Sequence, residues 1–356
     1  MYTDGLVPRA QADSCLVTCY VGPAHDLYHL SNVLTGFIEL AAAGRVEFRL
    51  EPAAEAIGQP LQSAAIQAQV TSAGLAIDVA FDVYDRSDVF ETALLESCGL
   101  YFKRSFYRPD IDRLPRSLQP KVIPLGMNYG CRSARGESLL LESGLRLDET
   151  LNRYRSVLAF EEFERGPNVA AEPSIVFQTR AWAPESTSDN VEEVNESRAR
   201  VIRALRRAFP HRFQGGFVAN LFAQQRYPDL LTVHSDELSQ YARFSKAHLI
   251  GISTRGLHHS MPFKLSEYLA ASLAIVSEPV RNELPAAFAD GRNFLEFHTP
   301  EECLEKCDRI LSDPALAAAL REASWRYYQA EVRPARHMAN VLERALRYLS
   351  TRQPAM

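Results

Sequence analysis

Two series of alternating strand and helix patterns run through the 356-residue sequence, and this alternation is the strongest limit on its fold. The first series begins with "SCLVTCYV" at residues 14–21, and the second begins with "SIVFQTRAW" at residues 174–182. A helical pattern follows each of these apolar runs, over residues 26–44 and residues 192–209. Repeated alternation of this kind predicts parallel sheets that are covered by helices.

The pattern weakens between residues 130 and 173, which we interpret as the region of a domain boundary. We expect an α/β protein of two Rossmann-like, doubly wound domains facing each other across a cleft, with ligands bound at the carboxyl ends of the strands. The predicted parts are an amino-terminal domain (residues 1–150), a carboxy-terminal domain (residues 151–335) and a terminal helix (residues 336–356) that can pack back on the first domain.

Local signals predict the remaining elements. Pro262 marks the start of one helix, and Thr299 with Glu302 forms a capping box at the start of another. Further strands are expected at residues 45–52, 75–85, 100–106 (an edge strand), 121–129, 213–218, 248–254, 274–279 and 293–299, and further helices at residues 89–99 and 236–246, with two more after residue 313.

Composition excludes several classes of partner. Hydrophobic residues make up 46% of the chain, charged residues make up 23%, and the formal net charge is −5. Because no segment is dominated by basic residues, broad attraction to nucleic acid or to an anionic membrane is not expected. No apolar stretch has the length of a transmembrane helix, and residues 1–14 lack a signal-peptide pattern, so we expect a cytoplasmic protein. The six cysteines lack the spacing of common metal sites and are expected to be buried or half-buried thiols.

An unusual charge pattern marks the segment "GLHHSMPFKLSEYLAAS" at residues 256–272. His258, His259 and Lys264 cluster at a predicted helix start, where the free N–H groups already carry partial positive charge. A bound anion such as a diphosphate would remove this repulsion. Glu267 lies on nearly the same helix face, and its carboxylate suits the hydroxyls of a ribose. The alternative is an ordinary surface ion pair between Lys264 and Glu267.

The order His-His-Ser-x-Pro-x-Lys-x-x-Glu-Tyr-Leu-Ala, followed by "AIVSEP" and "DGRNFLEFHTPEE", resembles the donor-binding domain of nucleotide-sugar glycosyltransferases of the GT-B fold. The similarity is to group-1, family-4-like enzymes, with a weaker similarity to exostosin-type transferases. It implies that Glu267 holds the donor ribose and that Lys264 meets the diphosphate, with His258, His259 and Ser260 beside them. Retaining members usually carry Glu where this chain has His259, which leaves the stereochemistry open.

Arg180 ends the first strand of the second series and resembles the basic residue that many GT-B enzymes place on the donor phosphates. Its planar guanidinium suits two phosphate oxygens, and the alternative is a surface arginine beside Trp182. Because Arg180, Lys264 and a helix terminus can neutralise a diphosphate, we expect no required metal and no cofactor besides the nucleotide-sugar substrate.

Acidic and histidine side chains near the strand ends of the first series are candidates for acid–base chemistry. Asp85 and Asp88 could orient an acceptor hydroxyl or act as a base, or they could simply cap a helix that begins near Val89. His25 follows the first strand, where some inverting GT-B enzymes place a histidine base, with Asp26 or one of the other aspartates as its partner. Alternatively, His25 only precedes a helix capped by Asp26.

The predicted function is transfer of a sugar from a nucleoside-diphosphate sugar to a hydroxyl of a glycan or small-molecule acceptor in the interdomain cleft. Two alternatives remain at this point. A GT-B-like nucleotide-sugar epimerase would share the donor site, and a non-catalytic two-domain protein would close on a small ligand without reaction.

Overall fold

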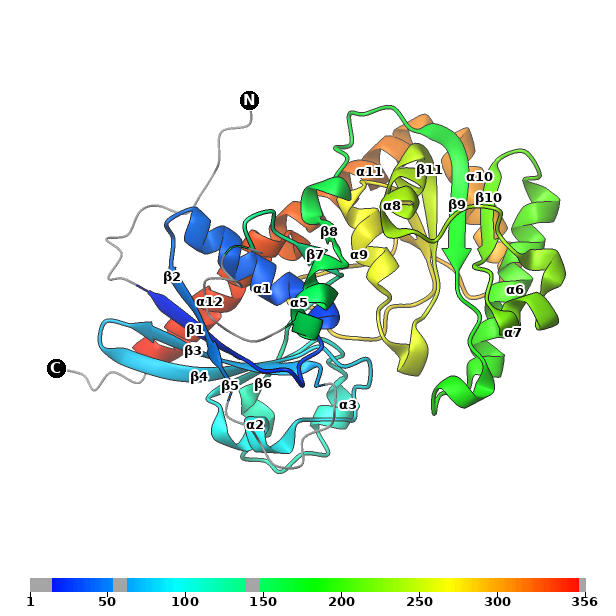
Figure 1. Ribbon diagram of the computed structural model, residues 1–356. Helices are drawn as coiled ribbons and strands as arrows, with labels where there is room; N and C mark the ends of the chain where they lie inside the picture. The colour runs from blue at the N-terminus through cyan, green and yellow to red at the C-terminus, as the bar shows by residue number, and fades with distance from the viewer. Residues whose placement is uncertain (1–14, 54–62, 137, 139–147, 352–356) are drawn as a thin grey trace.

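The computed structural model describes residues 15–53, 63–136, 138 and 148–351, and it contains two α/β domains that face each other (Figure 1). A six-stranded sheet forms the centre of the amino-terminal domain, and a five-stranded sheet forms the centre of the carboxy-terminal domain. The two-domain α/β architecture expected from the sequence is therefore confirmed. Residues 1–14, in which we predicted no signal peptide, lie outside the described residues.

The amino-terminal sheet has the strand order β2-β1-β3-β4-β5-β6. Its strands are β1 (Leu16–Val21), β2 (Glu47–Pro52), β3 (Ala65–Ser72), β4 (Leu75–Asp82), β5 (Leu100–Lys103) and β6 (Val122–Pro124).

Strand β3 was not predicted, and it departs from a purely parallel sheet. It runs antiparallel to both β1 and β4. The two residues between β3 and β4, Ala73 and Gly74, have φ angles of 51° and 76°, as the tightest hairpin turns require. The expected edge position of β5 is also wrong, because β5 lies between β4 and β6.

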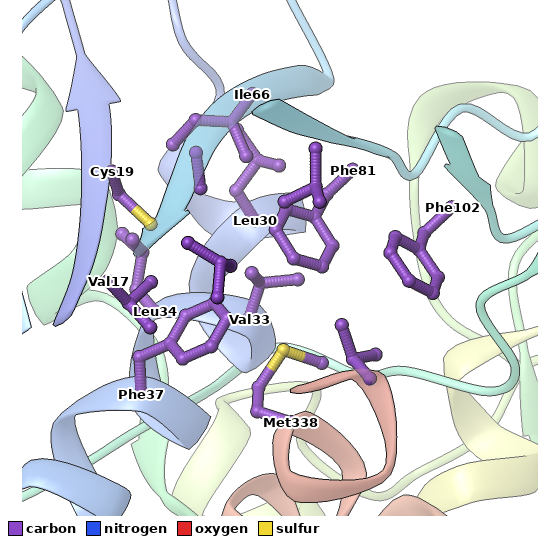
Figure 2. Close-up of a cluster of buried hydrophobic side chains, with 14 of the residues drawn as sticks. Val17, Cys19, Leu30, Val33, Leu34, Phe37, Ile66, Phe81, Phe102 and Met338 are labelled. Carbon is purple, nitrogen blue, oxygen red and sulfur yellow. The ribbon is translucent and has the colours of Figure 1, made fainter. Parts of the chain in front are cut away.

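Two helices far apart in the sequence cover one face of this sheet. Helix α1 (Leu27–Ala42) and helix α12 (Pro334–Ser350) lie side by side against it in Figure 1. Their buried side chains, among them Phe37 and Met338, form one core with the inward-facing residues of the strands (Figure 2). On the opposite face, α2 (Thr92–Ser97) and α3 (Arg108–Ile111) cover β4, β5 and β6.

All four strand pairs of the carboxy-terminal sheet are parallel, in the order β10-β9-β11-β12-β13. Its strands are β9 (Glu172–Thr179), β10 (Phe213–Phe217), β11 (His248–Ser253), β12 (Ala274–Ser277) and β13 (Leu295–Glu296), and its helices are α6 (Val191–Ala208), α7 (Leu221–Arg226), α8 (Leu238–Ala247), α9 (Phe263–Ala270), α10 (Pro300–Ser312) and α11 (Pro314–Tyr327). The predicted Thr299 cap of α10 is confirmed, since its side chain accepts a hydrogen bond from the Glu302 N–H.

The chain passes between the domains in two places. The first passage contains β7 (Cys131–Arg132), α5 (Asp148–Arg155) and β8 (Leu158–Ala159), and the second is the π-helical segment Tyr328–Val332 between α11 and α12. The hydroxyls of Tyr129 and Tyr328 lie 2.9 Å apart, so the two passages are hydrogen-bonded to each other.

The described residues also test the expectations about the cysteines and about membrane-spanning helices. Cys15 is partly buried and the other five cysteines are buried, and all six are free thiols, as predicted. Within the described ranges, every helix is too short or too polar to cross a membrane.

Candidate functional site

A cavity of about 330 Å³ lies between the two domains, where strands β9 and β11 end. From β9 the chain continues to β10, at one end of the strand order, and from β11 it continues to β12, toward the other end. The gap between β9 and β11 is therefore the topological switch point where open α/β sheets bind ligands. The amino-terminal domain contributes Tyr28, His29, Asp85 and Arg104 to the wall, and the carboxy-terminal domain contributes residues that include Arg180, Arg198, Tyr241, Ser260, Lys264 and Glu267.

A tight turn leads from β11 into helix α9 at the edge of this cavity. The Gly256 N–H donates to the Ser260 carbonyl over 2.8 Å, and a Cβ on Gly256 would approach Ser260 Oγ to 2.5 Å. Glycine is therefore needed for this close approach. Pro262 is the N-cap of α9 and provides no side-chain cap. The first amides of α9 are consequently suited to an anion, which the helix dipole also favours.

Lys264 brings a cation to this helix start. Its Nζ donates to the backbone carbonyl of Gln178 and lies 5.1 Å from the centre of the Phe177 ring. Burial, together with the positive charges of Arg198 and Arg180, lowers the pKa of the Lys264 ammonium to about 7, and the Glu267 carboxylate opposes this change. An anionic ligand would restore the charged form.

Arg198 is a second cation of the site. It is buried, and sequence reasoning missed it. It lies in the apolar stripe of α6, and its guanidinium donates to the Thr254 hydroxyl and to the carbonyls of Arg180 and Arg255, at 2.8–3.2 Å. All three partners are neutral. Burial lowers the pKa of Arg198 to about 10, so the side chain remains charged at neutral pH. The sequence did contain a signal for Arg198, because it is a charged residue within the apolar stripe of a predicted helix. A buried arginine at such a position needs polar partners.

Glu267 lies one turn after Lys264 and lines the same cavity. Burial raises the pKa of its carboxyl to about 7, and the Lys264 ammonium and the Tyr241 hydroxyl oppose that rise. Tyr241 comes from α8 and was also missed, because nothing local connects that helix with α9. A carboxyl with this pKa changes protonation near neutral pH, so a ligand hydroxyl can select its charged form.

The opposite wall presents a histidine, but not the one predicted. His25 is buried with 8% exposure, its Nδ1 accepts a hydrogen bond from the Gly22 N–H, and it is not among the residues that line the cavity. His29 lies one turn further along α1 and does line it. Its Nδ1 is 2.7 Å from Asp26 Oδ2. Burial alone would raise the pKa of Asp26, but hydrogen bonds from His29 and the Tyr28 amide hold that pKa below its usual value.

The predicted aspartates separate in the structure. Asp85 lines the cavity and forms a 2.5 Å ion pair with Arg104, whose guanidinium also donates to the Met261 carbonyl just before α9. Asp88 points elsewhere and pairs with Arg86 at 2.8 Å. The helix-cap alternative for both aspartates is wrong, since α2 begins at Thr92 with Glu91 as its N-cap.

Four of the six predicted donor-site residues come together in the cavity, namely Arg180, Ser260, Lys264 and Glu267. His258 and His259 do not line it. Both have left-handed backbones, with φ angles of 53° and 60°, and their side chains face neighbouring cavities. The His258 N–H donates to Asp189 over 2.7 Å, which holds the turn in place.

Two Rossmann-like domains around an interdomain site of this kind constitute the GT-B architecture. Residues 198–343, less than half of the chain, match the family model described as glycosyl transferase-like, so the resemblance to group-1 glycosyltransferases is confirmed. No curated protein matches the chain.

Solved structures with similar folds have low sequence identity. The carboxy-terminal domain of a group 1 glycosyl transferase from Francisella tularensis is 12% identical, covers 48% of this chain and 96% of its own, and has a TM-score of 0.36. Sucrose-phosphate synthase from Thermosynechococcus elongatus is 15% identical over 72% of this chain, with a TM-score of 0.40. UDP-GlcNAc 2-epimerase from Neisseria meningitidis, bound to UDP-GlcNAc, is 14% identical over 72% of this chain, with a TM-score of 0.36. This chain spans 61% and 63% of the latter two proteins.

Proposed function

We propose that this protein transfers a sugar from a nucleoside-diphosphate sugar to an acceptor hydroxyl in the interdomain cavity. One observation carries the proposal: the half-buried Lys264 and the buried Arg198 line a cavity together with the uncapped start of α9 and the Glu267 carboxyl. This arrangement suits a diphosphate followed by a ribose. The acceptor would be a glycan or a small molecule bound against the Tyr28 and His29 wall.

The chemistry follows from where charge develops. As the bond from the sugar to the diphosphate breaks, negative charge grows on the departing phosphate, and Lys264, Arg198 and Arg180 stabilise it. His29 is placed to remove the acceptor proton, because Asp26 accepts from Nδ1 and leaves Nε2 as the base. Enclosure between the domains limits hydrolysis of the donor by water.

Binding of a nucleoside diphosphate is the direct test of the donor site. In a thermal-shift screen with UDP, GDP, ADP, CDP and TDP, we expect at least one nucleotide to raise the melting temperature, since a ligand of the native state stabilises it. By calorimetry, Glu267→Gln should weaken that nucleotide by about 1–3 kcal/mol, the usual effect of losing a charged hydrogen-bond partner.

The matched control is Glu322→Gln, which changes a surface ion pair with Arg326 on α11 and should leave the affinity unchanged. Equal loss in both variants would remove Glu267 from the site. Failure of all five nucleotides to bind would favour the non-catalytic alternative, and an epimer formed from donor alone would replace transfer with epimerisation.

Metal independence is part of the proposal, and it rests on the cations described above. We expect turnover to continue in EDTA at a rate within about twofold of the untreated enzyme, while Arg180→Ala lowers turnover by about tenfold or more. Thermal unfolding of the variant checks that the fold is intact. Activity that disappears with EDTA and returns with magnesium or manganese would contradict this prediction.

The cytoplasmic location is likewise proposed. Cys303 and Cys307 lie one turn apart on α10, where both are buried and remain free thiols. Such unpaired thiols are typical of a reducing compartment.

A further inference from the structure

A second cavity, of about 390 Å³, lies on the other side of the turn that leads into α9. It is formed where β11, β12 and β13 end, so it also occupies the carboxyl edge of the parallel sheet. Ser260, Met261 and Pro262 line both cavities and separate them. Its volume falls in the range of about 300–1,000 Å³ that is usual for small-molecule sites.

Asn282 is the most informative residue of this second cavity. Its side chain is 5% exposed, and neither its Nδ2 nor its Oδ1 has a hydrogen-bond partner. An amide buried in this state costs free energy, because it has lost water at both a donor and an acceptor. Both atoms are covered from solvent. When the side chain turns toward the cavity, two ligand hydroxyls can satisfy it, one accepting from Nδ2 and the other donating to Oδ1.

The two neighbours of Asn282 in the sequence are held, one through its side chain and the other through its backbone. Arg281 donates to the Ser87 hydroxyl over 3.1 Å, and the Glu283 N–H donates to the Phe106 carbonyl over 2.9 Å. Both contacts cross to the amino-terminal domain. The chain on either side of Asn282 is therefore anchored to the amino-terminal domain before any ligand arrives, which lowers the entropic cost of ordering this segment on binding.

Some of the other polar side chains of the cavity already have hydrogen-bond or ion-pair partners within the protein, and one does not. Glu278 accepts from the Ser197 hydroxyl and the Arg255 N–H, and Arg255 also pairs with Glu193. These groups satisfy one another. By contrast, Arg200 on α6 lines the cavity and is exposed, with no hydrogen-bond or ion-pair partner in the part of the chain that the structure describes.

His259 adds a second group with both donor and acceptor capacity. Burial and the charges of Arg255 and Arg281 lower the pKa of its imidazole, so the ring is neutral at pH 7. One ring nitrogen then donates and the other accepts. The buried side chains of Leu265 and Phe297 add apolar surface to the same wall, which suits the C–H face of a sugar ring.

We propose that this second cavity binds an anionic monosaccharide, with its hydroxyls on Asn282 and His259 and its negative group on Arg200. The anionic group is a carboxylate or a phosphate, and the same guanidinium would accept either one. This site is distinct from the nucleotide cavity, and the inference does not depend on the proposed transfer reaction.

Calorimetry on the full chain tests the proposal with four probes: glucuronate, glucose 6-phosphate, glucose and inorganic phosphate. We expect at least one of the two anionic sugars to bind about tenfold or more tightly than both glucose and phosphate, because only an anionic sugar uses both halves of the site. Which of the two binds identifies the anionic group. Failure of both to bind would mean that water alone fills the cavity, and phosphate of equal affinity would reduce it to a simple anion site.

Substitutions then locate the binding. Asn282→Leu and the shape-preserving Asn282→Asp should each weaken the anionic sugar by about tenfold or more, and Arg200→Met should abolish its advantage over glucose. Glu267→Gln, in the nucleotide cavity, should leave this affinity unchanged. Thermal unfolding identifies a variant that has failed to fold. Unchanged binding in both folded Asn282 variants, or loss of binding in Glu267→Gln, would overturn the proposal.

Discussion

Lys264→Met is expected to reduce kcat by about 10²–10³, the usual effect of removing one group that stabilises developing charge. Methionine keeps the unbranched stem of lysine and removes the ammonium that would face the departing diphosphate. Stopped assays with the preferred donor would measure the loss. Lys306→Met is the matched control, because Lys306 forms a surface ion pair with Glu305 on α10, away from the cavity, and its kcat should be unchanged.

The pH dependence of the same reaction gives a second readout. In the proposed reaction Lys264 acts in its protonated form, and its pKa is lowered to about 7, so kcat/KM should fall as the pH rises above 7. The proposed ribose contact needs Glu267 as a carboxylate, and the pKa of Glu267 is raised to about 7, so kcat/KM should also fall as the pH decreases below 7. We expect a bell-shaped profile that loses its alkaline limb in Lys264→Met. A flat profile near neutral pH in the parent enzyme would contradict these roles.

His29→Asn is expected to reduce kcat by about 10²–10⁴, the range for loss of a general base. The amide keeps a hydrogen bond with Asp26 but cannot take the acceptor proton. His25→Asn should have a smaller effect, because His25 accepts from the Gly22 amide and does not line the cavity. The surface residue His211 gives the matched control, and His211→Asn should leave kcat unchanged.

The anomer of the product, determined by NMR, decides whether this base is needed. An inverted product together with the rate loss in His29→Asn would support direct displacement by the acceptor. A retained product, or a near-normal rate in His29→Asn, would leave phosphate-assisted departure of the sugar without a histidine base.

Local patterns predicted most helices and parallel strands but not the order of the strands in the amino-terminal sheet. Strand β3 and its hairpin turn interrupt the alternation of strand and helix after β2. The expected edge position of β5 failed for a related reason. A short strand with charged residues at its end resembles an edge strand, and only its pairing with β6 shows otherwise. Strand order depends on contacts between distant segments, which periodicity does not contain.

The parts of the candidate site that could be predicted are those whose residues lie within one short segment of the sequence. Lys264 and Glu267 lie on one helix turn, and Arg180 directly follows β9, whose carboxyl end points to the side of the sheet where such folds bind ligands. Arg198 and His29 reach the same cavity from α6 and α1. These two residues reach the cavity only because α6 and α1 pack near α9, and that packing cannot be read from local sequence patterns. Of these two, only Arg198 left a local signal, as a charged residue within an apolar helix face.

The hydrogen bond between Tyr129 and Tyr328 joins the two passages of the chain between the domains, and it restrains how the domains can move relative to each other. Glu164 reinforces the junction, since it accepts from the Tyr328 hydroxyl at 2.9 Å and from Arg333 at 2.8 Å. Two connections bonded to each other act as a single pivot. We expect any opening of the domains to be a rotation about this junction, with sliding restrained, so that His29 and Lys264 would face each other again on closure.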